Sequence, residues 1–165
     1  MQQKIYTVLV LCTGNSARSI LGEVLFNALG KGRFIAHSAG SKPVGKVNPF
    51  ALELLQQQGL STAGLRSKCW DEFAAPGAPD IDFIFTVCDN AAGETCPIWP
   101  GKPATAHWGI PDPAHVEGDE ARRAAFGKAY EQLVRRIQLF MSLPIEKLDR
   151  LALKEKLAEI GGIKG

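Results

Sequence analysis

The fold is decided by the stretch Ile5-Tyr6-Thr7-Val8-Leu9-Val10-Leu11, which runs directly into Cys12-Thr13-Gly14-Asn15-Ser16-Ala17-Arg18-Ser19. The nearly uninterrupted apolar first half predicts a strand over residues 5–11 that is buried on both faces. The apolar stripe that follows predicts a helix over residues 18–29, ended by Gly30. A strand that passes through a short loop into a helix directs backbone N–H groups and the positive end of the helix dipole to one point. Such a point suits a tetrahedral oxyanion.

Cys12 and Arg18 give this loop its candidate chemistry. At the mouth of the loop, the helix dipole and Arg18 are expected to lower the pKa of the Cys12 thiol and favour the nucleophilic thiolate. The guanidinium of Arg18 is a planar fork of donors that matches two oxygens of one oxyanion. The alternative is that Cys12 packs as a small hydrophobe at the end of a central strand. Gly14, Asn15 and Ser16 suit a tight, hydrogen-bonding loop, and this context favours the active-site interpretation.

Composition limits the classes of protein to which the chain can belong. Its 165 residues predict one domain with a sizeable core, and the 45% hydrophobic and 22% charged fractions are typical of a globular protein. No apolar stretch reaches the ~20 residues that span a bilayer, and no export signal is recognised. The net charge of +2 is small and its cationic residues are scattered, so nucleic-acid binding is not expected. Four cysteines without an export signal indicate reduced, chemically active thiols and a cytoplasmic protein.

Strands and helices alternate along the rest of the chain. Alternation of this kind requires parallel pairing with right-handed crossovers, so the predicted fold is α/β, an open four-stranded parallel sheet with helices on both faces. Ligands in such sheets bind beyond the carboxyl ends of the strands, and Cys12, Cys88 and Asp112 all follow predicted strands. The other expected strands are 33–38, 81–87 and 105–108, and the other expected helices start at Asn48-Pro49 or span 68–74 and 119–141.

The end of the chain is interpreted as an addition to this domain. We expect an α/β domain over residues 1–143 and a C-terminal helical extension over residues 144–165. The extension contains a predicted helix at 145–160 whose apolar residues lie roughly on one side. Packing on the domain is favoured over contact with a partner.

Two further cysteines suit a redox role. The topology can bring Cys88 to the sheet edge that holds Cys12, and Cys96 lies in the long irregular loop that follows. No pair of cysteines has zinc-site spacing, so no metal site is predicted. Such thiols suit exchange, in which a thiolate attacks a sulfur-linked centre and a neighbour resolves the adduct as a disulfide. The alternative for Cys96 is an incidental surface thiol, and Cys69 is interpreted as a packing or incidental residue.

Asp112 stands between Pro111 and Pro113, which hold it in a rigid turn. A carboxylic acid at the carboxyl edge of the sheet can protonate an oxygen that leaves the oxyanion as Cys12 attacks. Alternatively, Asp112 only initiates the turn before the next helix. The sequence favours neither interpretation.

The loop at 12–19 resembles the phosphate loop of low-molecular-weight protein tyrosine phosphatases. It is more similar still to that of the thioredoxin-coupled arsenate reductase family, which is built on the same low-molecular-weight phosphatase-like fold. The resemblance extends to about residue 141. Beyond the loop it rests on His37-Ser38-Ala39-Gly40, Asn48-Pro49, Thr86-Val87-Cys88-Asp89, Cys96-Pro97, His107-Trp108-Gly109 and Asp112-Pro113.

The resemblance implies arsenate reduction in three steps. The Cys12 thiolate attacks arsenate held by Arg18 and the loop amides, while Asp112 protonates the departing oxygen. Cys88 then attacks the Cys12 sulfur, which releases arsenite and leaves a Cys12–Cys88 disulfide. Cys96 attacks Cys88 and moves the disulfide to an exposed position that thioredoxin reduces. The implied substrate-binding residues are Thr13, Gly14, Asn15, Ser16, Ala17, Arg18 and Ser19.

The resemblance also bears on cofactors and partners. Some members of the family bind potassium through residues that match Asn15, Glu23 and Ser38, but the last position of that set reads Ser67-Lys68 here. The Lys68 ammonium can take the place of the cation, so no potassium requirement is expected. We expect no tightly bound cofactor, a monomer, phosphate and sulfate as mimics of arsenate, and an external thiol reductant. Thioredoxin, or glutaredoxin with glutathione, fits that role.

Two other functions compete with arsenate reduction. A hydrolase of phosphotyrosine or small phosphomonoesters would use Cys12, Arg18 and Asp112 in the same way, but it has no need of Cys88 and Cys96. Such phosphatases typically place tyrosines directly after Asp-Pro, whereas Ala114-His115 follow here. A non-catalytic oxyanion-binding module is the third candidate, and it has no need of a thiol with a lowered pKa.

Overall fold

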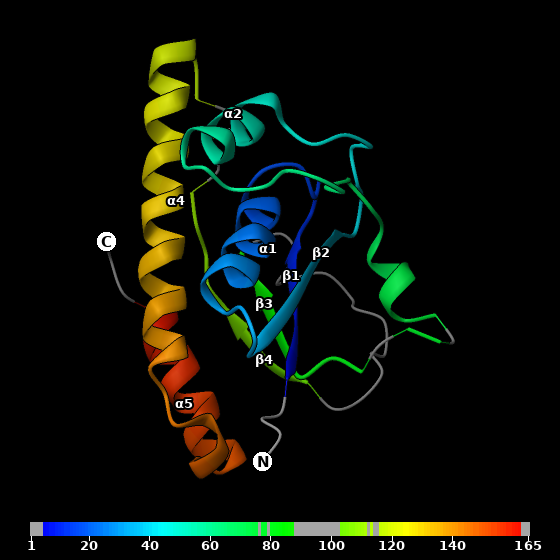
Figure 1. Ribbon diagram of the computed structural model, residues 1–165, viewed down its shortest axis with the longest axis vertical. Helices are drawn as coiled ribbons and strands as arrows, with labels where there is room; N and C mark the ends of the chain where they lie inside the picture. The colour runs from blue at the N-terminus through cyan, green and yellow to red at the C-terminus, as the bar shows by residue number, and fades with distance from the viewer. Residues whose placement is uncertain are drawn as a thin grey trace.

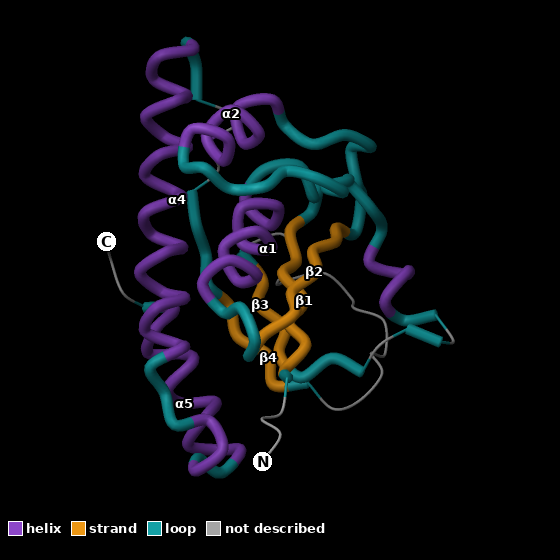
Figure 2. Tube along the Cα trace, viewed as in Figure 1, coloured by secondary structure: helices purple, strands orange, loops and turns teal. Residues whose placement is uncertain are grey.

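The computed structural model describes residues 5–75, 77–78, 80–87, 103–111, 113 and 116–162. In this part of the chain, four parallel strands form one sheet in the order β2-β1-β3-β4 (Figures 1 and 2). This arrangement confirms the predicted open four-stranded parallel sheet of an α/β fold. The strands are β1 (Tyr6–Cys12), β2 (Phe34–Gly40), β3 (Phe83–Thr86) and β4 (Ala104–His107).

The described α-helices all pack on one face of the sheet, and of the predicted helices on both faces only the 3₁₀ turn η1 is described on the other. The residues of β1 that point one way, Val8 and Val10, join a large core cluster with the helices α1, α2, α4 and α5. The alternate residues Leu9 and Leu11 join a smaller cluster with the turn η1 on the other face. Figure 1 shows α4 running along the outside of α1 and α2. The bounds are α1 (Arg18–Leu29), α2 (Pro49–Gln57), η1 (Trp70–Phe73), α4 (Asp119–Met141), η3 (Ile145–Lys147) and α5 (Arg150–Gly161).

Most predicted elements are confirmed, and their ends show why. The side chain of Asn48 accepts a hydrogen bond from the Phe50 N–H at 2.9 Å, so α2 begins where the Asn-Pro signal placed it. The predicted helix at 119–141 is observed with the same bounds. None of the helices in the described part of the chain is both long and apolar enough to cross a membrane.

The prediction of one helix over 145–160 is wrong. The segment forms the short 3₁₀ turn η3 and then the separate helix α5. Asp149 causes the break, because its backbone is extended and its side chain accepts a hydrogen bond from the Ala152 N–H at 2.7 Å. The predicted helix at 68–74 is likewise shorter than expected, because only the single 3₁₀ turn η1 forms there.

Aromatic rings hold the sheet, α4 and α5 together. Trp108, directly after β4, is fully buried, and its ring centroid lies 4.0 Å from that of Phe85 in β3. Phe26 of α1 and Phe140 of α4 pack against the same two rings. The indole N–H of Trp108 donates to the Leu157 carbonyl of α5 at 3.0 Å. The C-terminal helix is therefore fixed to the segment that follows β4.

Gly40 ends β2 directly against the loop that follows β1. A Cβ atom at this position would lie 2.9 Å from the carbonyl oxygen of Cys12 and closer still to that of Thr13. Backbone atoms cannot move aside as the end of a flexible side chain can, so the close approach of strand and loop requires glycine.

We expect Gly40→Ala to lower the free energy of unfolding by about 2 kcal/mol, because the added methyl group overpacks the backbone of the loop. Gly127→Ala in α4 is the matched control, since a Cβ there meets no atom within 4 Å. That control should raise the free energy of unfolding by about 0.5–1 kcal/mol through helix propensity. Urea unfolding followed by circular dichroism measures both, and equal effects of the two substitutions would contradict the proposed close packing.

Candidate active site

The predicted nucleophile lies where β1 meets the loop. Cys12 is the last residue of β1, pairs with Gly40 of β2, and is 5% exposed. Leu11, one residue earlier, pairs with Thr86 at the end of β3. The carboxyl ends of three strands therefore converge around Cys12, as the topological rule for ligand sites in parallel sheets predicts.

The start of α1 is free of side-chain caps. Ala17 occupies the cap position without a side-chain hydrogen bond, and the first turn of α1 contains no acidic residue. By contrast, Asn48 caps α2 and Asp149 caps α5 with side-chain oxygens. The positive end of α1 is thus not neutralised by a carboxylate of its own first turn, so it remains available to attract an anion.

Asn15 fixes the shape of the loop from within. Its backbone has a φ of 47°, in the left-handed region that asparagine tolerates better than most residues, and its side chain is fully buried. The amide nitrogen donates to Ser19 Oγ at 2.8 Å and to Ser38 Oγ at 3.0 Å. The amide oxygen accepts the Lys68 N–H at 2.9 Å. One side chain therefore ties the loop to α1, to β2 and to the segment before η1.

The carbonyl oxygens of the loop are bound by segments that lie outside it. The Thr13 carbonyl accepts the Lys42 N–H at 2.9 Å, and the Gly14 carbonyl accepts the Val44 N–H at 3.0 Å. The Ser16 carbonyl accepts the Asn48 N–H at 2.8 Å. These bonds turn the three carbonyl groups away from the centre of the loop, where their negative ends would repel an anion. Asn15 and Ser19 are buried and bonded to each other, so their side chains stabilise the conformation of the loop.

Arg18 points toward the segment that follows β4. Its Nη1 donates to the Ile110 carbonyl at 2.8 Å. That segment is itself tied to β3, because the Trp108 N–H donates to the Thr86 carbonyl at 2.7 Å and the Ile110 N–H to the Val87 carbonyl at 3.0 Å. The structure thus brings together the loop, Arg18 and the stretch of chain that leads into Pro111.

Three predicted site residues, Cys88, Cys96 and Asp112, lie outside the described residues, as do Ala114 and His115. The described residue before Cys88 is Val87, whose N–H donates to the Leu11 carbonyl at 2.9 Å. The roles of these three residues stay predictions from the sequence.

A partly buried ion pair between Lys68 and Glu23 lies next to the residues that hold the loop. Lys68 is 8% exposed, and its Nζ lies 3.5 Å from Glu23 Oε1 and 3.2 Å from the Arg66 carbonyl. The same Glu23 oxygen accepts the Ser38 hydroxyl at 2.6 Å. Burial lowers the pKa of Lys68, and the charge of Glu23 opposes that shift. The ammonium therefore lies beside the Glu23 carboxylate to which Ser38 is bonded.

His37 lies near this pair on β2. Burial is the main cause that lowers its pKa, and the Lys68 charge acts in the same direction while Glu23 opposes it. Its ring centroid lies 5.3 Å from that of Phe73. Among the described residues, His, Cys, Asp and Glu form no group of three that could hold a metal ion.

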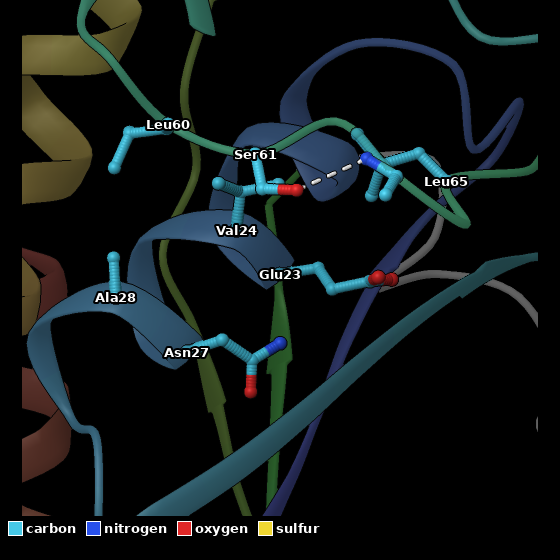
Figure 3. Close-up of a pocket in the computed structure, with 8 residues that line it drawn as sticks. Glu23, Val24, Asn27, Ala28, Leu60, Ser61 and Leu65 are labelled. Atoms are coloured by element: carbon cyan, nitrogen blue, oxygen red, sulfur yellow. Dashed lines mark hydrogen bonds between the residues drawn. The ribbon is translucent and has the colours of Figure 1, made fainter.

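A pocket of about 310 Å³ lies on the side of α1 that faces the segment after α2. Figure 3 shows Glu23 and Asn27 projecting from α1 toward β2, with Leu60 and Leu65 across the pocket. Asn27 is bonded to Ala36 of β2, so its amide is occupied. Glu23 is the one charged residue among those that line the pocket, and its carboxylate disfavours an oxyanion there.

Sequence reasoning missed one charged residue close to the site. Arg136 of α4 is 6% exposed, and its Nη1 donates to the Gly109 carbonyl at 3.0 Å. The available signal was its spacing, because Arg136 falls on the same helical stripe as Leu133, Ile137 and Phe140, which are all buried.

Comparison with known proteins agrees with this geometry. A model of the family described as low molecular weight phosphotyrosine protein phosphatase matches residues 7–155. An arsenate reductase from Halalkalibacterium halodurans is 33% identical over 141 residues, which cover 85% of this chain and 96% of that protein. The crystal structure of an arsenate reductase from Archaeoglobus fulgidus has a TM-score of 0.59 at 30% identity and covers 79% of this chain and 98% of its own.

A low molecular weight protein tyrosine phosphatase from T. tengcongensis is similar in structure as well, with a TM-score of 0.65 at 25% identity over 87% of this chain and 99% of that one. The family match spans the sheet, the loop with Cys12 and Arg18, and all of α4. The chain therefore belongs to the low molecular weight phosphotyrosine protein phosphatase family, with arsenate reductases among its relatives.

Proposed function

We propose that this protein is an arsenate reductase that works by a thiol relay. The observation that carries the proposal is the loop itself, which joins Cys12 at the end of β1 to Arg18 at the first position of the uncapped helix α1. Relatives that are arsenate reductases match most of the chain, and they support arsenate as the substrate. The two cysteines at 88 and 96 favour reduction over hydrolysis, because hydrolysis of a phosphate ester needs neither.

The first proposed step forms an arsenic–sulfur bond. The loop amides and Arg18 hold arsenate, and the Cys12 thiolate attacks the arsenic atom. One arsenic–oxygen bond breaks, and Asp112 gives the departing oxygen a proton, so that water leaves. Asp112 is given this role because the family resemblance implies it, and the hydrogen bond from Arg18 to the Ile110 carbonyl, two residues earlier in the chain, supports it.

The second proposed step transfers the electrons. The Cys88 thiolate attacks the Cys12 sulfur, the arsenic–sulfur bond breaks, and its electron pair remains on arsenic, which leaves as arsenite. A Cys12–Cys88 disulfide results. Cys96 then attacks Cys88, which frees Cys12 as a thiolate and forms a Cys88–Cys96 disulfide. An external dithiol of the thioredoxin or glutaredoxin class reduces that disulfide, and we propose that the enzyme acts as a cytoplasmic monomer.

Hydrolysis of phosphomonoesters is the second candidate function. The family includes phosphatases of similar structure, and phosphate has the same tetrahedral shape as arsenate. A phosphatase would use Cys12 as nucleophile and release phosphate by attack of water on the cysteinyl phosphate. Activity toward a small aryl phosphate without any activity toward arsenate would favour this function.

The relay predicts which disulfide forms in each variant. When the reduced protein reacts with arsenate without reductant, we expect one arsenite per chain and a Cys88–Cys96 disulfide in mass spectrometry. Cys12→Ser should form neither product, and Cys96→Ser should stop at a Cys12–Cys88 disulfide. Cys69→Ser is the matched control and should behave as the unaltered protein, because Cys69 packs against the smaller core cluster. Normal turnover of Cys96→Ser with thioredoxin would overturn the three-thiol version.

The ion pair between Lys68 and Glu23 predicts independence from potassium. Asn15, Glu23 and Ser38 match the potassium residues of the family, but the Lys68 ammonium lies 3.5 Å from Glu23, so a cation and Lys68 do not fit together. We expect equal activity in potassium and sodium chloride. Lys68→Ala should lower the melting temperature and make both melting temperature and activity rise with potassium, whereas choline chloride at equal ionic strength should restore neither. A clear rise in the activity of the unaltered protein with potassium would contradict this account.

A further inference from the structure

The buried side chain of Arg136 forms hydrogen bonds to backbone carbonyls outside its own helix. Its side chain leaves α4 and donates through Nη1 to the Gly109 carbonyl at 3.0 Å and, at the longer distance of 3.4 Å, to the Trp108 carbonyl. Burial lowers the pKa of its guanidinium. Burying a cation is costly unless its donors are bonded. The contacts to carbonyl dipoles offset part of that cost, and they fix this backbone to α4.

The same short segment is held by the active-site arginine. Ile110, the residue after Gly109, accepts a hydrogen bond from Arg18 Nη1 at 2.8 Å. Three consecutive carbonyls, from Trp108 to Ile110, therefore accept hydrogen bonds from two guanidiniums, one from α1 and one from α4. A planar guanidinium that gives one donor to a fixed carbonyl has its rotation restricted, and its remaining donors are then directed.

We propose that Arg136 is a positioning residue for Arg18. By holding the Gly109 peptide against α4, Arg136 fixes the Ile110 carbonyl that orients the Arg18 guanidinium, and it thereby raises the affinity of the loop for a tetrahedral oxyanion. This inference rests on the proposed function only for the identity of the oxyanion as arsenate. Affinity for inorganic phosphate tests it without any turnover.

The helix offers a matched pair of arginines for the test. Arg135 is adjacent to Arg136 in α4 but exposed, so Arg135→Gln removes the same charge without touching the segment 108–110. Arg136→Gln removes the guanidinium, and Arg136→Lys keeps the charge but loses the planar fork. Circular dichroism and thermal melting establish that each variant is folded.

Isothermal titration with inorganic phosphate gives the affinity of each variant. We expect Arg136→Gln to weaken phosphate binding about tenfold and Arg136→Lys about threefold, while Arg135→Gln leaves it unchanged. If Arg136→Gln fails to fold, Arg136→Lys decides alone. Phosphate affinity unchanged in a folded Arg136 variant, or equally reduced in Arg135→Gln, would overturn the proposal.

A double-mutant cycle separates positioning from general support of the fold. If Arg136 acts through Arg18, the substitution Arg136→Gln should cost less than about twofold in phosphate affinity once Arg18→Lys is present. A full tenfold loss in that background would assign Arg136 a role independent of Arg18. A protein that binds phosphate with the expected pattern but reduces no arsenate would refute the proposed function and leave this inference standing.

Discussion

The loop depends on the buried amide of Asn15. A non-glycine residue in the left-handed region costs of order 1 kcal/mol or more and persists only where its surroundings determine it. Here the surroundings are Ser19, Ser38 and the backbone of Lys68, each bonded to the same side chain within 3.0 Å. These residues come from α1, from β2 and from the segment before η1. Three separate segments of the fold therefore hold this one turn of backbone in place.

The charges around the loop are divided between its two sides. On one side, Lys68 and Glu23 form a partly buried pair that adds little net charge. On the other side, the uncapped start of α1 and the guanidinium of Arg18 are both positive. The attraction for an anion therefore comes from the start of α1 and from Arg18, and we infer that it acts on the loop that begins at Cys12. Arg18 is also bonded to the Ile110 carbonyl. The orientation of its guanidinium therefore depends on how firmly the segment 108–110 is held.

The sequence predicted the elements whose signals are local. The apolar run before Cys12 and the stripe after Arg18 marked β1 and α1, and the Asn48-Pro49 signal marked α2. The bounds of α4 followed from its long stripe. The break at Asp149 was missed because a capping aspartate inside an apolar pattern competes with the periodicity, and the side-chain hydrogen bond decides between them. The position of Lys68 beside Glu23 was expected because the chain departs from the family's potassium set at Ser67-Lys68.

The spacing of Arg136 indicated burial, but its contacts could not be predicted, for a different physical reason. Its bonds to the Gly109 and Trp108 carbonyls join residues 27 and 28 positions apart, and no local pattern reports a contact over that separation. The roles of Cys88, Cys96 and Asp112 still rest on the sequence. The part of the site that the structure describes is the loop after β1 and the residues that hold it in place.

We propose that Cys12 is a thiolate at neutral pH because the start of α1 and Arg18 stabilise its negative charge. The direct test is the rate of alkylation by iodoacetamide as a function of pH, in the variant Cys69→Ser/Cys88→Ser/Cys96→Ser, which retains Cys12 alone. We expect the pKa of the Cys12 thiol to lie well below that of a free cysteine and alkylation to slow when inorganic phosphate is added. A pKa near the ordinary value of about 8.5, together with a rate that phosphate does not change, would contradict it.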